Sequence, residues 1–145
     1  MNECLKCSTV AKNFNLCNKC NEKESYYPKE NDPLNIGDYF KCYQKPEGYY
    51  LDIKDHLYKK CYERCLTCDI KGDELIHNCM KCNSNYSFQI LLKNSNYSNC
   101  YENCSYFHFF DENNKYHCTN DSSCPGEYPK LIKDELECVK SCSEH

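Results

Sequence analysis

The sequence lacks most of the residues from which an ordinary globular core is built. Tryptophan is absent, alanine occurs once, and Leu, Ile, Val and Phe together number 25 of 145 residues. This share is below the level at which a chain is expected to fold around an apolar core alone. Glycine is also scarce, with four residues, and no glycine-rich phosphate loop is present. Without another source of stability, this composition would predict disorder.

Long apolar runs and an excess of basic charge are missing as well. The apolar runs that exist, 90–92 and 107–110, are far shorter than the ~20 residues of a membrane span. The 18 basic and 22 acidic residues are interspersed and give a net charge of −4. The sequence therefore has no basic patch of the kind that indicates binding to nucleic acid or to a lipid surface. We expect no nucleic-acid partner and no direct membrane insertion.

Cysteine, in contrast, is abundant, with 16 residues. Such density is typical of small scaffolds in which disulfides replace a core, each contributing roughly 2–4 kcal/mol. Disulfides persist in oxidising compartments, so we expect a secreted or cell-surface protein. The first residues carry no apolar stretch after a basic start and predict no signal peptide. We therefore expect the chain to be an excerpt of a longer protein.

The cysteine spacing repeats within the chain. The block Cys4, Cys7, Cys17, Cys20, Cys42 returns with similar gaps as Cys65, Cys68, Cys79, Cys82, Cys100. Short repeats of this kind are expected to stack along an axis. The pattern predicts an N-terminal cysteine-rich repeat over 1–60, a central repeat over 61–123, and a single-bridge hairpin with the start of the next repeat over 124–145.

The central spacing, Cys61-x3-Cys65-x2-Cys68-x10-Cys79-x2-Cys82-x17-Cys100-x3-Cys104-x13-Cys118, resembles the furin-like repeats of growth-factor-receptor cysteine-rich regions. The resemblance is best over residues 61–118. It implies that the first cysteine joins the third and the second joins the fourth, before two single-bridge hairpins. Carried onto this sequence, it implies the pairs Cys61–Cys68, Cys65–Cys79, Cys82–Cys100 and Cys104–Cys118, with Cys124–Cys138 as one more hairpin.

The N-terminal repeat departs from this pattern. Lys45 stands where a cysteine normally precedes the Pro-Glu-Gly-Tyr-Tyr motif, and the cysteine that would pair with it, near Tyr58, is also absent. Because both cysteines of one bridge are missing together, we infer that a whole disulfide was lost. This favours the pair Cys20–Cys42 over the alternative Cys42–Cys61, and the pair Cys4–Cys17 then follows. Cys7 and Cys142 are left without partners, which we expect to lie beyond the two ends.

Local patterns between the cysteines predict strands and turns. Alternation over 86–92 predicts a strand, 94–96 a turn, and 97–100 the returning strand. Segments 106–110 and 115–118 flank an Asp-Glu-Asn-Asn turn in the same way. We expect a small disulfide-rich fold: an elongated array of short β-hairpins and coil with little helix.

Zinc is the strongest chemical alternative. Two stretches, Cys4-x2-Cys7-x9-Cys17-x2-Cys20 and Cys65-x2-Cys68-x10-Cys79-x2-Cys82, have the spacing of zinc knuckles. Eight further cysteines lie outside such pairs, which favours disulfides. The five histidines are scattered without a nucleophile elbow, and no acidic cluster fits an EF-hand. We expect no enzyme, no catalytic residue, no metal and no cofactor, with a zinc-organised adaptor as an alternative.

The remaining function is recognition. Alternation along 104–118 places Phe107 and Phe109 on one face with Lys115 and His117. We hypothesise that these four residues form part of a contact with another extracellular protein or with neighbouring repeats. The alternative is that a loop of the same chain, such as 86–92, covers the two rings. The chain is then a protein-binding or scaffolding module, or else a purely structural stalk or coat element.

Four Asn-x-Ser sequons agree with a secreted glycoprotein. Their acceptor residues are Asn85, Asn96, Asn103 and Asn120.

Overall fold

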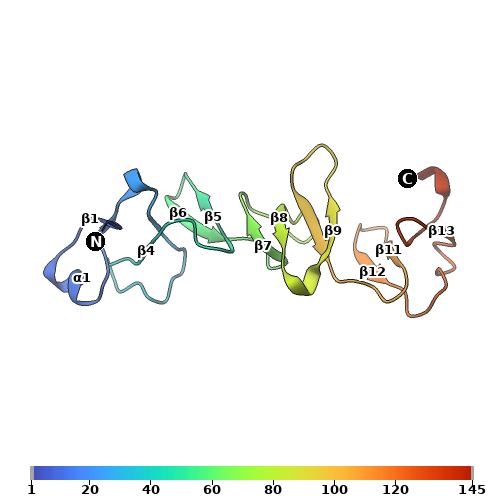
Figure 1. The fold of residues 1–145 in the computed structure, drawn as a ribbon, viewed down its shortest axis with the longest axis horizontal. Helices are drawn as coiled ribbons and strands as arrows, with labels where there is room; N and C mark the ends of the chain where they lie inside the picture. The colour runs from blue at the N-terminus through green and yellow to red at the C-terminus, as the bar shows by residue number, and fades with distance from the viewer. Residues whose placement is uncertain (1, 145) are drawn as a thin grey trace.

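The computed structural model describes residues 2–144, so the end residues of the first and last expected segments lie outside the described residues. Short strand pairs follow one another from the N-terminus to the C-terminus and form a rod (Figure 1). The solvent-accessible surface is 10006 Å², against about 7,800 Å² for a compact monomer of the same mass. The expected elongated array of hairpins is thus confirmed.

The N-terminal third consists of three two-stranded sheets. They are formed by β1 (Cys4–Lys6) with β2 (Lys19–Cys20), β3 (Tyr27–Pro28) with β4 (Cys42–Tyr43), and β5 (Tyr49–Asp52) with β6 (Leu57–Lys60). The short helix α1 (Thr9–Asn13) begins at Ser8, whose hydroxyl accepts a hydrogen bond from the N–H of Ala11. One 3-10 turn, η1 (Glu22–Glu24), follows β2.

Two four-stranded sheets make up the rest of the rod. The central sheet has the order β7-β8-β10-β9, from β7 (Cys65–Cys68), β8 (Cys79–Cys82), β9 (Phe88–Leu91) and β10 (Ser98–Tyr101). The C-terminal sheet has the order β12-β11-β14-β13, from β11 (His108–Phe110), β12 (Tyr116–Cys118), β13 (Lys130–Ile132) and β14 (Glu137–Val139). The 3-10 turns η2 (Ser84–Tyr86) and η3 (Cys142–Glu144) complete the elements.

The predicted strands are present but shorter at their starts. Tyr86, the first residue of segment 86–92, belongs to η2, and β9 begins at Phe88. Strand β14 pairs in parallel with β11 through Glu137 and His108. The C-terminal sheet therefore spans the boundary expected between residues 123 and 124.

Disulfides form the cores of this rod. They join Cys4–Cys17, Cys20–Cys42, Cys61–Cys68, Cys65–Cys79, Cys82–Cys100, Cys104–Cys118 and Cys124–Cys138, the same pairs that the sequence and its furin-like resemblance favour. Five buried cysteines make the largest core cluster, which lies in the central module, the part of the chain that carries the central sheet. Cys7 and Cys142 are exposed free thiols. Because the bridges are local in sequence, each module is stapled separately and contacts mainly its neighbours.

Asparagine replaces glycine in many turns. Among the described residues, nine other than glycine have positive φ, and five of them are Asn, at positions 15, 31, 78, 94 and 114. Asn tolerates the left-handed region better than most residues because its side chain bonds to the nearby backbone. Tight turns are therefore possible in a chain with four glycines.

Within residues 2–144, no helix is long and apolar enough to cross a bilayer.

Candidate functional site: a groove between the two four-stranded sheets

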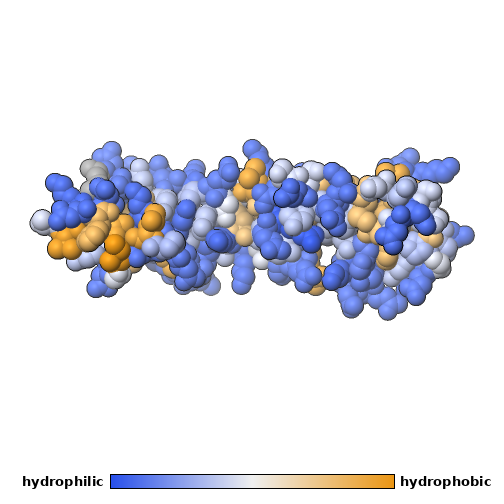
Figure 2. Space-filling view, turned by 90° about the horizontal axis from the view of Figure 1, so that it is seen from below, coloured by the Kyte–Doolittle hydropathy of each residue, from blue (hydrophilic) through white to orange (hydrophobic). Residues whose placement is uncertain are grey.

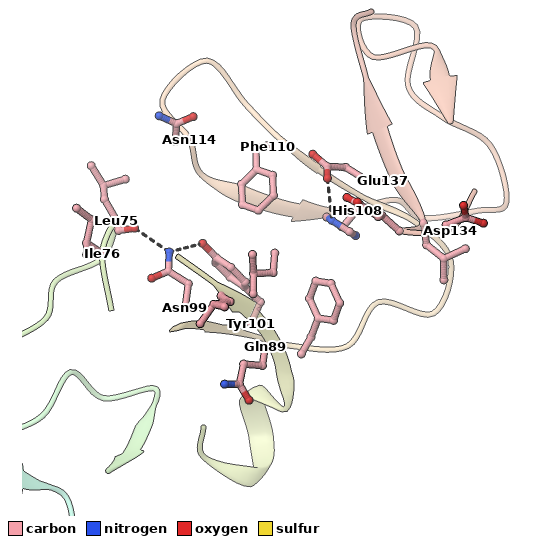
Figure 3. Close-up of a pocket in the computed structure, with 15 residues that line it drawn as sticks. Leu75, Ile76, Gln89, Asn99, Tyr101, His108, Phe110, Asn114, Asp134 and Glu137 are labelled. Atoms are coloured by element: carbon pink, nitrogen blue, oxygen red, sulfur yellow. Dashed lines mark hydrogen bonds and ion pairs between the residues drawn. The ribbon is translucent and has the colours of Figure 1, made fainter. Parts of the chain in front are cut away.

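An open groove of about 940 Å³ lies where the central and C-terminal sheets meet. Its base is formed by β9, β10 and β11, and its two walls by the loop before β8 and the turn between β13 and β14. Figure 3 shows that the side chains of Asn99, Tyr101, His108 and Phe110 face one another across this space. The volume lies within the range of ligand-binding clefts.

The base of the groove is a cluster of aromatic rings that joins the two sheets. Phe88 packs on His108, with 5.1 Å between ring centroids. Tyr101 stacks on Tyr116 at 4.3 Å and meets Phe110 edge-on at 5.6 Å. Burial raises the pKa of the Tyr116 phenol to about 12. Because rings of the central sheet pack against rings of the C-terminal sheet, these contacts fix the position of one sheet relative to the other.

The first wall presents two exposed aliphatic side chains, Leu75 and Ile76. Their backbone is fixed, because one carboxylate oxygen of Asp73 accepts hydrogen bonds from both of their N–H groups, at 2.9 and 2.8 Å. These bonds hold the pKa of the Asp73 carboxyl below its usual range. The amide of Asn99 donates to the carbonyl of Leu75 at 2.8 Å. The backbone that carries these two aliphatic side chains is therefore held in one position.

Behind this wall lies a fully buried histidine, His77. Its ring packs against Tyr62 and Tyr101, with centroids at 4.6 and 5.1 Å. Its backbone N–H donates to the side-chain oxygen of Asn99 at 2.8 Å. Gly72 lies so close that an added Cβ would be 1.9 Å from the carbonyl oxygen of His77. The segment that carries the first wall is thus anchored at the buried His77, while residues 73–76 are exposed.

The second wall is the turn between β13 and β14. Leu136 has a φ of 55° and is the only aliphatic residue with positive φ among the described residues. Its carbonyl accepts a hydrogen bond from the N–H of His108 at 3.0 Å. Its side chain is 51% exposed and lines the groove. On the opposite side, Leu91 of β9 is 66% exposed.

The charge along the groove has one sign. Asp134, Glu135 and Glu137 line it, and none of the described lining residues is Lys or Arg. His108 is the only histidine among the described lining residues, and it is 3% exposed. Its Nε2 atom makes no hydrogen bond and lies 3.7 Å from a carboxylate oxygen of Glu137. The groove thus combines an aliphatic surface with an acidic rim.

The residues predicted to contact a partner lie on the other face of β11 and β12. Phe109 is half-buried between the rings of His117, at 5.1 Å, and Tyr128, at 4.9 Å. His117 in turn pairs with the Asp111 carboxylate at 2.8 Å, which lowers the pKa of that carboxyl. For Phe109 the structure therefore agrees with the alternative, in which the same chain covers the ring. Its cover comes from Tyr128, and not from 86–92.

The other two residues of the predicted contact differ in exposure. Phe107 is half-buried, and its backbone N–H and carbonyl both bond to Thr119. Lys115 is exposed. Of the four residues, the structure thus brings Phe109 and His117 into contact with each other.

The opposite face of this hairpin packs against the preceding, central sheet. His108, Phe110 and Tyr116 contact Phe88 and Tyr101 of the central module. The groove opens beside this contact. Sequence reasoning missed its apolar residues, although Leu75 and Ile76 within a polar loop and the run 90–92 were visible signals.

The remaining predicted residues lie away from the groove. All four sequon asparagines, Asn85, Asn96, Asn103 and Asn120, are exposed. Every cysteine of the two knuckle-like motifs except Cys7 is in a disulfide. Among residues 2–144, no group of three or more His, Cys, Asp or Glu is arranged to hold a metal ion.

A second apolar area occupies the N-terminal end of the rod, as Figure 2 shows. Exposed apolar side chains in this part of the chain are Leu5, Val10, Phe14, Leu34 and Ile36.

Comparison of the chain with protein-family models, with curated proteins and with solved structures found no match in any of the three.

Proposed function

We propose that the chain is a non-enzymatic, extracellular cysteine-rich segment that binds another protein through the groove between its two four-stranded sheets. The observation that carries this proposal is the set of exposed aliphatic side chains, Leu75, Ile76, Leu91 and Leu136, on a backbone fixed by hydrogen bonds and packed rings. Exposed apolar surface within a concavity is typical of interaction sites. The furin-like resemblance supports a place among the repeats of a larger secreted or surface protein.

The compartment follows from the disulfides. Seven bridges in one chain are typical of secreted and surface proteins, because reducing compartments do not maintain them. The exposed sequons agree with passage through a compartment that glycosylates.

The rod shape favours a second candidate, a structural stalk that spaces other domains without binding a ligand. The groove distinguishes the two. We would immobilise the disulfide-intact chain and test capture of proteins secreted by its source. The Leu91→Ser variant should lose a partner that the wild type and the Leu34→Ser control retain, because Leu34 is similarly exposed, at 57%, but lies in the N-terminal module. Equal capture by all three chains, or none by any, would favour the stalk.

A further inference from the structure

The groove reaches the free edge of a β-strand. In the central sheet, β9 has β10 on one side and, among residues 2–144, no strand on the other. All four residues of β9, Phe88–Leu91, line the groove, although their side chains alternate between two faces. A groove that touches both sets must extend along the edge of the strand.

Backbone hydrogen-bonding groups are directed away from the sheet along this edge. The N–H of Leu92 bonds to the carbonyl of Tyr97, and Ile90 pairs with Asn99 in the same register. Bonded pairs alternate in an antiparallel ladder, so the backbone groups of Gln89 and Leu91 point away from β10. Such an edge is a template for an added strand.

The groove also selects for charge. Two of its carboxylates, those of Asp134 and Glu135, lie on the turn that faces β9, and that of Glu137, the first residue of β14, lies 3.7 Å from Nε2 of His108. A segment that enters between this turn and β9 brings its side chains near these carboxylates. Complementarity of sign favours Lys and Arg and opposes Asp and Glu.

The backbone conformation of Leu136 also supports a binding role for the groove. A left-handed backbone costs a residue with a Cβ roughly 1–2 kcal/mol, and Asn or Gly would fit better. Of the eight other left-handed non-glycine residues described, five are Asn and the rest are polar, yet a leucine stands here with half of its side chain exposed. Strain that is kept at an exposed apolar residue indicates a functional use of the side chain.

We propose that an extended polypeptide segment, with aliphatic side chains at alternate positions and Lys or Arg beside them, adds as a strand to the edge of β9 and places its aliphatic groups against Leu91 and Leu136. This inference rests on the proposed function and names the class of partner that the groove accepts. Within residues 2–144 no strand covers this edge of β9, and the proposed occupant is a segment of another protein.

Synthetic peptides test the three elements of this proposal separately. The first peptide has Val at alternate positions, Ser between them and Lys at both ends. The second has Glu at the ends, the third has Ser in place of Val, and the fourth is the first with alternate backbone nitrogens methylated. We would measure affinities by fluorescence anisotropy and map the contact by amide chemical shifts.

The first peptide should bind and shift the amides of Gln89 and Leu91, and its affinity should fall as salt increases from about 50 to about 300 mM. Each of the other three should bind at least about tenfold more weakly, a change of 1.4 kcal/mol. Equal affinity of the methylated peptide would overturn strand addition, and equal affinity of the Glu peptide would overturn the charge preference.

Variants of the chain connect the peptides to the groove. Leu136→Asn should weaken binding about tenfold while the free energy of unfolding stays equal or rises, since Asn accepts the left-handed backbone. Asp134→Lys should weaken binding of the Lys peptide, whereas Asp38→Lys, an exposed acidic residue of the N-terminal module, should not. If Leu136→Asn loses stability and keeps its affinity, the leucine is structural and the proposal fails.

The inference and the proposed function can fail separately. Loss of natural-partner capture in Leu91→Ser, with no binding of any peptide, would retain the groove as an interface but reject the strand-adding segment. Self-association of the chain through the groove in sedimentation, lost in Leu91→Ser, would assign the edge to a second copy and also reject the proposal.

Discussion

The Nδ1 atom of His77 accepts a hydrogen bond from the backbone N–H of Cys100, at 2.9 Å. The other ring nitrogen, Nε2, lies 3.1 Å from the carbonyl oxygen of Glu74 and therefore carries the proton and donates it. Burial lowers the pKa of this imidazole. Both ring nitrogens are thus used in the neutral state, and a proton on Nδ1 would place an N–H against the N–H of Cys100.

This arrangement predicts a loss of stability in acid. The unfolded histidine binds its proton near pH 6.5, whereas the folded one binds it only at lower pH, so acidification below about 6.5 favours the unfolded state. Urea unfolding with intact disulfides should give a smaller free energy at pH 5 than at pH 7. His77→Gln should be less stable at both pH values and lose this component, while the exposed His56→Gln should keep it. If the free energy of unfolding falls by the same amount between pH 7 and pH 5 in His77→Gln and in the wild type, the loss of stability in acid does not come from His77.

The packing of Phe109 between His117 and Tyr128 predicts a structural role for this ring. Phe109→Ala should lower the free energy of unfolding by about 2–3 kcal/mol, at the lower end of the cost for buried aromatic rings because Phe109 is only half-buried. Lys115→Ala, at the exposed neighbour, should change it by less than about 0.5 kcal/mol. An unfolding curve unchanged by Phe109→Ala, together with weaker partner binding, would restore Phe109 to an interface.

The hairpins and their bridges could be predicted because both are local. Cysteine spacing and alternation place β11 and β12 and the turn between them within two residues. The joining of hairpins could not be predicted, because one parallel pair between His108 and Glu137 leaves no pattern in either segment. The same holds for Tyr128, which covers Phe109 from a loop about 20 residues further along the chain.

The groove escaped prediction for a related reason. Leu75 and Ile76 lie in a turn without periodicity, and their position depends on Asp73 and on Asn99, which is distant in sequence. A lone histidine such as His77 also gives no sign in the sequence that it will be fully buried. Contacts distant in sequence create the candidate site: those around Asn99 fix its first wall, and those between the two sheets bring its second wall close.

The rod predicts a large radius of gyration in solution. A compact chain of this length would have a radius near ~15 Å. X-ray scattering of the monomer should give a clearly larger value and a pair-distance distribution with a long tail. A radius near ~15 Å would mean that the two ends fold back onto each other, in conflict with Figure 1.

Glycosylation should favour Asn96 over Asn103 when the chain is secreted. Asn96 is exposed at the tip of the hairpin between β9 and β10. Asn103 lies between two bridged cysteines, and its side-chain amide donates to the hydroxyl of Ser87 at 2.7 Å. Glycopeptide mapping should find Asn96 the best occupied of the four sequons. Occupied Asn103 with empty Asn96 would contradict this geometry.

The central claim is that disulfides, and not metal, hold the modules that build the groove. Its most direct test is to count free thiols in the denatured, unreduced chain and to measure bound zinc in the same sample. Of 16 cysteines, 14 are bridged. The account therefore predicts two free thiols, at Cys7 and Cys142, and no stoichiometric zinc. Free thiols at most of the cysteines, or one zinc ion for each knuckle-like motif, would contradict it.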